Sequence, residues 1–212
     1  MVGGEDRRHS LMVRTASDML PLGTPAPDFR LPDSVTGREV ALGDFAAERP
    51  LLVMFICNHC PYVVHVRGEF ARLEQDYDGR LSIVAINANS LDTHPQDGPG
   101  HMRALATELG WKFPFLFDRA QAVAKAYHAA CTPDFFLFDA ARGSGKSRPL
   151  IYRGQLDASR PGNDEPVDGR DLRAAIDSVL AGRDVPREQR PSLGCNIKWS
   201  PGNEPDYFGA SA

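Results

Sequence analysis

Two cysteines lie three positions apart in the run Cys57-Asn58-His59-Cys60-Pro61. Two thiols at this spacing can be oxidised to a disulfide and reduced again. The reactive form is the thiolate, which the positive end of a helix favours over the neutral thiol. The spacing therefore predicts a redox-active dithiol, provided that a helix begins beside it.

The residues around the pair predict such a helix. The apolar run 51–56 (LLVMFI) is typical of a strand buried on both faces. An apolar stripe at steps of three and four along residues 63–77 predicts a helix, with Pro61 in its first turn. Residues 81–87 predict a second buried strand, which completes a βαβ unit with neighbouring parallel strands. We expect Cys57 to face the helix N-terminus as the low-pKa nucleophile, and Cys60 to be shielded in the first helical turn.

The remaining pattern continues an α/β architecture. Phe29–Leu31 and Glu39–Leu42 predict two short strands joined by a turn. Further helices are predicted over 101–109, 121–127 and 168–180, extended segments over 113–117, 135–139 and 150–153, and a turn around 142–146.

The chain resembles the redoxin (AhpC/TSA-like) branch of thioredoxin-fold proteins, which includes thioredoxin-like thiol reductases. The resemblance rests on CNHCP after a buried strand, on Thr132-Pro133 before a predicted hairpin, and on the segments GTPAPDFRL and YRGQLD; it covers Leu22 to Leu180. It implies a central mixed β-sheet flanked by helices, with an N-terminal strand extension and an irregular C-terminal tail. It also implies Cys57 and Cys60 as catalytic residues, a cis Pro133 beside them, and Thr132 offering its backbone to an incoming chain.

Two departures from the family pattern matter for mechanism. Thioredoxins usually carry a buried acid on the strand before the motif, but 51–56 contains none. The proton acceptor for Cys60 is therefore open between His59, His65, Glu69 and water. Peroxiredoxins place Thr or Ser three residues before the reactive cysteine, whereas Met54 stands there, which disfavours peroxidase chemistry.

His59 between the two cysteines is expected to support the Cys57 thiolate by its charge or its N–H groups. Cys131 and Cys195 are possible additional redox thiols. Cys131, two residues before Pro133, is otherwise a small buried hydrophobe. Cys195 is a distant resolving thiol, a partner for Cys131, or a packed residue beside Trp199. The cysteines and histidines lack the paired spacing of a zinc site, so we expect no metal and no other cofactor.

The length and the charge of the chain argue against several other classes of protein. The chain has 212 residues and a formal net charge of −4, which argues against a nucleic-acid partner. It shows no run long enough to span a membrane and no signal-peptide pattern, so we expect a cytoplasmic protein. We expect a tail over 1–20, a thioredoxin-like domain over 21–184, and a tail over 185–212 that wraps across the domain.

The sequence therefore predicts a thiol–disulfide oxidoreductase that acts in redox homeostasis. Its partners would be a protein or small-molecule disulfide or dithiol and an upstream thiol reductant. Two alternatives stay open. One is a peroxiredoxin-like antioxidant peroxidase using Cys57, and the other is a non-enzymatic module that binds a partner or holds a metal.

Overall fold

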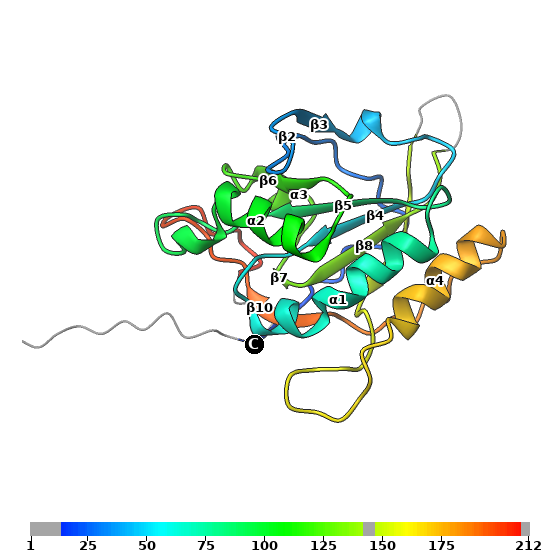
Figure 1. Cartoon of the computed structure of the whole chain (residues 1–212). Coiled ribbons are helices and arrows are strands. Elements are labelled where there is room, and N and C mark those ends of the chain that lie inside the picture. The colour runs from blue at the N-terminus through cyan, green and yellow to red at the C-terminus, as the bar shows by residue number, and fades with distance from the viewer. Residues whose placement is uncertain (1–13, 142–146, 209–212) are drawn as a thin grey trace, which may run out of the picture.

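A five-stranded mixed sheet forms the centre of the molecule in the computed structural model, which describes residues 14–141 and 147–208 (Figure 1). The strand order is β6-β5-β4-β8-β9. The strands are β4 (Leu51–Phe55), β5 (Ser82–Asn87), β6 (Phe115–Phe117), β8 (Asp134–Phe138) and β9 (Leu150–Gly154). β4 runs parallel to β5 and antiparallel to β8. Every residue of β4 is buried, as expected of an unbroken apolar strand at the centre of a sheet.

Helices cover both faces of this sheet. α1 (Pro61–Asp76), α2 (Pro99–Leu109) and α4 (Arg170–Leu180) pack their buried side chains against one face, together with Leu52 and Met54 of β4. α3 (Ala122–Ala126) packs on the other face with Leu51 and Val53. The alternation of β4 side chains between two cores follows from the two-residue period of a strand.

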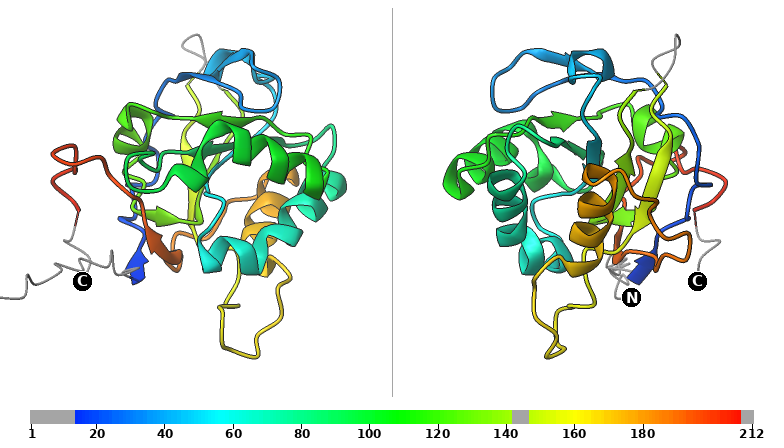
Figure 2. Two further views of the ribbon diagram at one scale, coloured as in Figure 1. Left: turned by 60° about the vertical axis from the view of Figure 1, so that its left-hand side comes forward. Right: turned by 90° about the vertical axis from the view of Figure 1, so that its right-hand side faces the viewer.

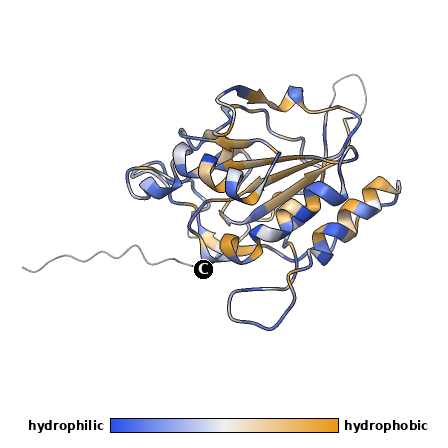
Figure 3. Cartoon of the chain, in the orientation of Figure 1, coloured by the Kyte–Doolittle hydropathy of each residue, from blue (hydrophilic) through white to orange (hydrophobic). Residues whose placement is uncertain are grey.

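Hydropathy follows the same layering. In Figure 3 the central strands are mostly hydrophobic, whereas α1 and α4 alternate between hydrophobic and hydrophilic residues along their length. On α1 the buried positions include Val63, Val66, Phe70 and Leu73, which is the predicted stripe. The helices therefore lie where their apolar faces meet the sheet.

A hairpin and two short 3-10 helices complete the first half. β2 (Arg30–Pro32) and β3 (Glu39–Ala41) pair antiparallel, and η1 (Leu42–Asp44) follows them. η2 (Pro95–Asp97) lies in the loop between β5 and α2. The Asp33 carboxylate accepts hydrogen bonds from the N–H groups of Val35 and Thr36, which closes the predicted turn.

A second, three-stranded sheet was not predicted. It has the order β1-β10-β7 and joins β1 (Arg14–Ala16), β10 (Leu193–Asn196) and β7 (Cys131–Thr132). All of its pairings are antiparallel. Part of each segment predicted as a tail is thus a strand, and β10 crosses beside the start of α1 (Figure 1).

Further along, Ile197 and Trp199 are buried in the core on the α3 face. The loop after β9 projects away from the sheet, in yellow in both views of Figure 2. Residues 1–13 of the predicted N-terminal tail and the predicted turn at 142–146 lie outside the described residues. Within the described ranges, none of the helices combines the length and the apolar character that crossing a bilayer requires.

Candidate active site

Cys57 and Cys60 lie where the carboxyl end of β4 meets the start of α1. Cys57 follows β4 by two residues, and Cys60 is the N-cap residue, with Pro61 in the first turn as predicted. Cys60 closes the first turn of α1, because its carbonyl oxygen accepts a hydrogen bond from the N–H of Val64 at 2.9 Å, which agrees with its expected place. Both thiols are buried, with exposed fractions of 1% for Cys57 and 0% for Cys60.

Thr132 contacts both thiols. Its Oγ1 lies 3.3 Å from the sulfur of Cys57, and its carbonyl oxygen accepts a hydrogen bond from the Cys60 thiol at 3.1 Å. The peptide bond between Thr132 and Pro133 is cis, as the resemblance implied. The structure thus brings together four of the predicted site residues from two distant parts of the chain.

Cys195 joins this cluster from β10. In the pairing of β10 with β7, Cys195 stands opposite Thr132 and Asn196 opposite Cys131. The backbones approach so closely that a Cβ added at Gly194 would lie 2.0 Å from the Thr132 carbonyl oxygen. From the resemblance we expected the backbone of Thr132 to be available for pairing with an incoming chain. In the structure that backbone is already paired with β10 of the same chain.

The electrostatics of the cluster favour a thiolate on Cys60. Hydrogen bonds from the thiols of Cys195 and Cys57, with one from the N–H of Val63, hold the pKa of Cys60 far below that of an ordinary thiol. The Thr132 carbonyl accepts a hydrogen bond from the neutral Cys60 thiol and so opposes this effect. Burial raises the pKa of Cys57, and the hydrogen bond to Cys60 and the charge of Asp97 raise it further. The pKa of Cys195 is raised as well, by its hydrogen bond to Cys60 and by burial.

This order corrects the expectation that Cys57 is the low-pKa thiol. The expectation assumed that Cys57 faces the free N–H groups of the helix. In the structure Cys60 is the N-cap residue and interacts with the thiols of Cys195 and Cys57, whereas Cys57 lies near a buried carboxylate.

Asp97 is the site residue that sequence reasoning missed. It is fully buried, and its carboxylate accepts hydrogen bonds from the N–H of Asn58 and the side chain of Asn89. The Nδ1 of His59 lies 2.7 Å from Asp97 Oδ2. Burial alone would raise the pKa of Asp97, but the hydrogen bonds from His59 and Asn89 bring it below its usual value. The available signal was topological: the loops after the parallel strands β4 and β5 meet at one edge of the sheet.

Two of the suggested proton acceptors for Cys60 have other partners. His65 Nε2 lies 2.7 Å from the hydroxyl of Ser159. The buried Glu69 carboxylate is paired with Arg72 and Arg173. Among the described residues, the titratable groups that interact with Cys60 are the thiols of Cys57 and Cys195.

A further buried acid follows Pro133. Asp134, the first residue of β8, is fully buried and accepts a hydrogen bond of 2.5 Å from the Ser17 hydroxyl. Burial raises the pKa of Asp134 to about 7. Cys131 is also fully buried, its thiol faces the Pro133 carbonyl at 3.6 Å, and burial raises its pKa. Cys131 thus has the surroundings of a packed hydrophobe.

Cys57, His59 and Asp97 each offer one potential ligand atom within 4.8 Å of the others. Sulfur, nitrogen and oxygen donors of this kind suit zinc and related metals. The oxygens of Asp97, however, already accept hydrogen bonds from Asn58 and Asn89, and one lies beside His59. The Asp97 oxygens therefore already have donors from the protein itself.

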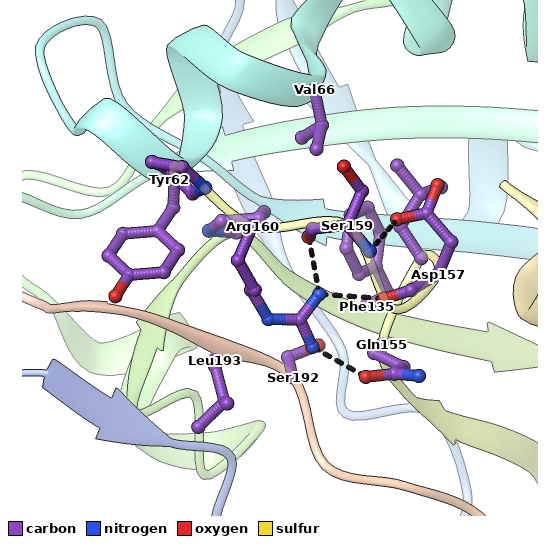
Figure 4. Close-up of a pocket in the computed structure, with 12 residues that line it drawn as sticks. Tyr62, Val66, Phe135, Gln155, Asp157, Ser159, Arg160, Ser192 and Leu193 are labelled. Atoms are coloured by element: carbon purple, nitrogen blue, oxygen red, sulfur yellow. Dashed lines mark hydrogen bonds between the residues drawn. The ribbon is translucent and has the colours of Figure 1, made fainter. Parts of the chain in front are cut away.

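Beside the thiols, a cavity of about 20 Å³ lies between Tyr62, Pro133 and Leu193. Figure 4 shows Arg160 at its centre, reaching from the loop after β9 toward Gln155. The guanidinium donates to Gln155 Oε1 at 2.5 Å and to the carbonyl oxygens of Asp157 and Ser159. These bonds lie within residues 155–160, so Arg160 holds this loop in its own shape, and the cavity has room for about one water.

These features define a protein of the thioredoxin fold, with a cysteine pair at a helix start and a cis-proline loop opposite it. A thiol:disulfide interchange protein from Chlorobium tepidum TLS shares the fold, with a TM-score of 0.55 and 14% identity over 74% of this chain and 97% of that one. The sequence profile of the AhpC/TSA family matches residues 22–143, more than half of the chain. The chain belongs to the AhpC/TSA family.

Two solved structures are much closer in sequence. An uncharacterized conserved protein from Geobacillus kaustophilus is 49% identical, with a TM-score of 0.85 over 90% of this chain and 98% of that one. A hypothetical protein from Sinorhizobium meliloti 1021 is 48% identical, with a TM-score of 0.83 over 89% and 100%. No curated protein matches the chain. The family and the fold support a redox function in general.

Proposed function

We propose that the protein is a thiol–disulfide oxidoreductase whose redox centre is the Cys57–Cys60 pair. The observation that carries the proposal is the contact of both sulfurs with Thr132, at the start of α1, where the environment lowers the pKa of Cys60. A thiolate held beside a second thiol is the arrangement that thiol–disulfide exchange requires.

The reaction would run in two exchange steps. One sulfur of the pair, as thiolate, attacks a sulfur of the substrate disulfide; a mixed disulfide forms, and the other substrate sulfur leaves as a thiolate. The second cysteine then attacks the mixed disulfide, so that the Cys57–Cys60 bond closes and the substrate receives two electrons in total. An upstream dithiol reverses both steps. A cytoplasmic location, which the sequence predicts, favours the reductive direction.

Reduction of insulin disulfides by the dithiol form tests the proposal. We expect wild type and Cys131→Ser, the matched control at an equally buried thiol, to reduce insulin at similar rates. Cys60→Ser should lose at least about 100-fold, and Cys57→Ser should lose activity in part, because a mixed disulfide cannot then be resolved by the Cys57–Cys60 pair. Activity retained in the Cys57→Ser/Cys60→Ser double variant would overturn the assignment.

Membership of the AhpC/TSA family and the hydroxyl of Thr132 beside Cys57 keep a thiol peroxidase as a second candidate. The raised pKa of Cys57 argues against it, because the peroxide-attacking species is a thiolate. Stopped-flow oxidation by hydrogen peroxide separates the two. We expect a rate no faster than that of a free thiol; a much faster rate abolished by Cys57→Ser would establish the peroxidase.

A further inference from the structure

Three buried thiols, and not two, converge on Thr132. Cys57 and Cys60 contact its side chain and carbonyl, and Cys195 stands opposite it in the β7–β10 pairing. Cys195 belongs to the same core cluster as the pair and is 3% exposed. The side chains of Cys60 and Cys195 are hydrogen-bond partners.

Cys60 is the middle member of this group. Its thiol contacts the Thr132 carbonyl, opposite which Cys195 stands, and it interacts with the thiols of both Cys57 and Cys195. Cys131 contacts the Pro133 carbonyl instead. A disulfide that includes Cys60 can therefore have either of two partners.

We propose that Cys195 is a third redox-active thiol, which exchanges with the Cys57–Cys60 disulfide to form a Cys60–Cys195 disulfide. The proposal rests on the proposed function, since it needs the first disulfide to form. The Cys195 thiolate attacks the sulfur of Cys60, the bond between Cys57 and Cys60 breaks, and Cys57 leaves as a thiolate. Cys57 takes up the proton that Cys195 released, so the step balances without any external oxidant or reductant.

The position of β10 favours this exchange. Gly194 has no side chain, and the backbone contact that this permits sets the neighbouring Cys195 opposite Thr132, whose carbonyl contacts the Cys60 thiol. On the far side of β10, the pairing with β1 places Arg14 opposite Cys195. Downstream, the Ile197 N–H donates to the Ala130 carbonyl and the Lys198 N–H to Asn89 Oδ1. Cys195 is therefore held at the site by a strand that is paired on both sides and by the hydrogen bonds that follow it.

Peptide mapping of the oxidised protein tests the proposal directly. The reduced full-length chain is equilibrated in a glutathione buffer, quenched with acid, alkylated and digested with trypsin. Cys57 and Cys60 share the tryptic peptide 39–67, whereas Cys195 lies in 188–198 and Cys131 in 126–142. A Cys57–Cys60 disulfide gives a looped peptide 39–67. A Cys60–Cys195 disulfide gives 39–67 linked to 188–198, with the alkyl group on Cys57.

We expect both products from wild type and from the Cys131→Ser control, in a constant ratio reached from either the oxidised or the reduced side. Cys57→Ser should yield the linked peptide alone, and Cys195→Ser the looped peptide alone. Serine keeps a hydrogen-bond donor toward Cys60. The oxidation equilibrium constant of Cys195→Ser against glutathione should therefore fall below that of wild type by a factor of one plus the linked-to-looped ratio.

The looped peptide alone in wild type, with no linked peptide from Cys57→Ser, would overturn the role of Cys195 and leave the proposed function intact. The absence of both disulfides from folded, glutathione-equilibrated wild type would overturn both proposals. A link between Cys131 and Cys195 would contradict the assignment of Cys60 as the central sulfur.

Discussion

At the scale of single residues, the charge at this site is governed by Cys60 and by Asp97. The motif predicted two redox cysteines, but the order of their pKa values depends on which thiols and carboxylates the fold places beside each of them. Cys60 interacts with two other thiols, whereas Cys57 lies near a carboxylate. No local pattern identified that carboxylate, because Asp97 lies forty positions further along in a loop rich in Asp, Pro and Gly.

His59 should act on Cys57 through Asp97. Removing the imidazole by His59→Ala leaves the Asp97 charge less compensated, so the pKa of Cys57 should rise; Asp97→Asn removes the charge, and the pKa of Cys57 should fall. We expect each change to be on the order of one pKa unit, about 1.4 kcal/mol. The pH dependence of iodoacetamide labelling, read at Cys57 by peptide fragmentation, measures both.

A double-mutant cycle provides the control. In the Asp97→Asn background, His59→Ala should change the pKa of Cys57 much less than it does in wild type. Equal effects in both backgrounds would mean that His59 acts on Cys57 directly, as the sequence alone suggested.

At the scale of elements, the β1-β10-β7 sheet is the part of the fold that the sequence did not predict. Strands β1, β7 and β10 have two to four residues each, too short for an alternating pattern to be recognised. Their pairing partners are also far apart in sequence. The longer elements could be predicted because β4, α1 and α4 bury long, regular apolar patterns.

Gly194→Ala should loosen β10. The new Cβ would meet the backbone of Thr132 and Pro133, which cannot rotate away as a side chain can, so β10 has to shift. We expect a loss of about 1–3 kcal/mol in the free energy of unfolding. Labelling of the buried thiols under native conditions should also become faster, and both effects can be measured by denaturant titration and by timed alkylation.

Gly68→Ala on α1 is the matched control, since a Cβ there meets open space. It should raise stability by about 0.5–1 kcal/mol and leave thiol labelling unchanged. If Gly194→Ala labelled its thiols no faster than Gly68→Ala, β10 would not be what shields the site.

At the scale of the whole molecule, the fold could be predicted from the sequence. The burial of the cysteines under distant segments of the chain could not. The buried strand, the helix stripe and the Thr-Pro signal depend on local sequence, and all three are present in the structure. The burial of all four cysteines depends on how distant segments close over them. Buried acids such as Asp134 belong to the same category, because burial is a property of the assembled chain.

Asp134 should make stability fall as pH rises. Its pKa is about 7 in the folded protein, against about 3.9 for an unperturbed aspartate, so between these values the folded chain binds more protons than the unfolded one. The free energy of unfolding should therefore decrease from pH 4 to pH 7, with a contribution on the order of 4 kcal/mol from this group.

Urea titrations across that range check this expectation. Asp134→Asn should remove most of the decrease, whereas the exposed control Asp164→Asn should keep it. A wild type and an Asp134→Asn variant with parallel pH profiles would show that Asp134 stays ionised in the fold.

The reduction potential of the cysteine couple, measured against glutathione between pH 7 and pH 8.5, tests the central claim most directly. If the reduced site holds a Cys60 thiolate and protonated Cys57 and Cys195, oxidation releases one proton for two electrons. The potential should then fall by about 30 mV per pH unit. The same slope is expected whether the oxidised form is Cys57–Cys60 or Cys60–Cys195. A slope near 60 mV per pH unit would contradict the Cys60 thiolate, and a folded protein that forms no disulfide at any glutathione ratio would contradict the account as a whole.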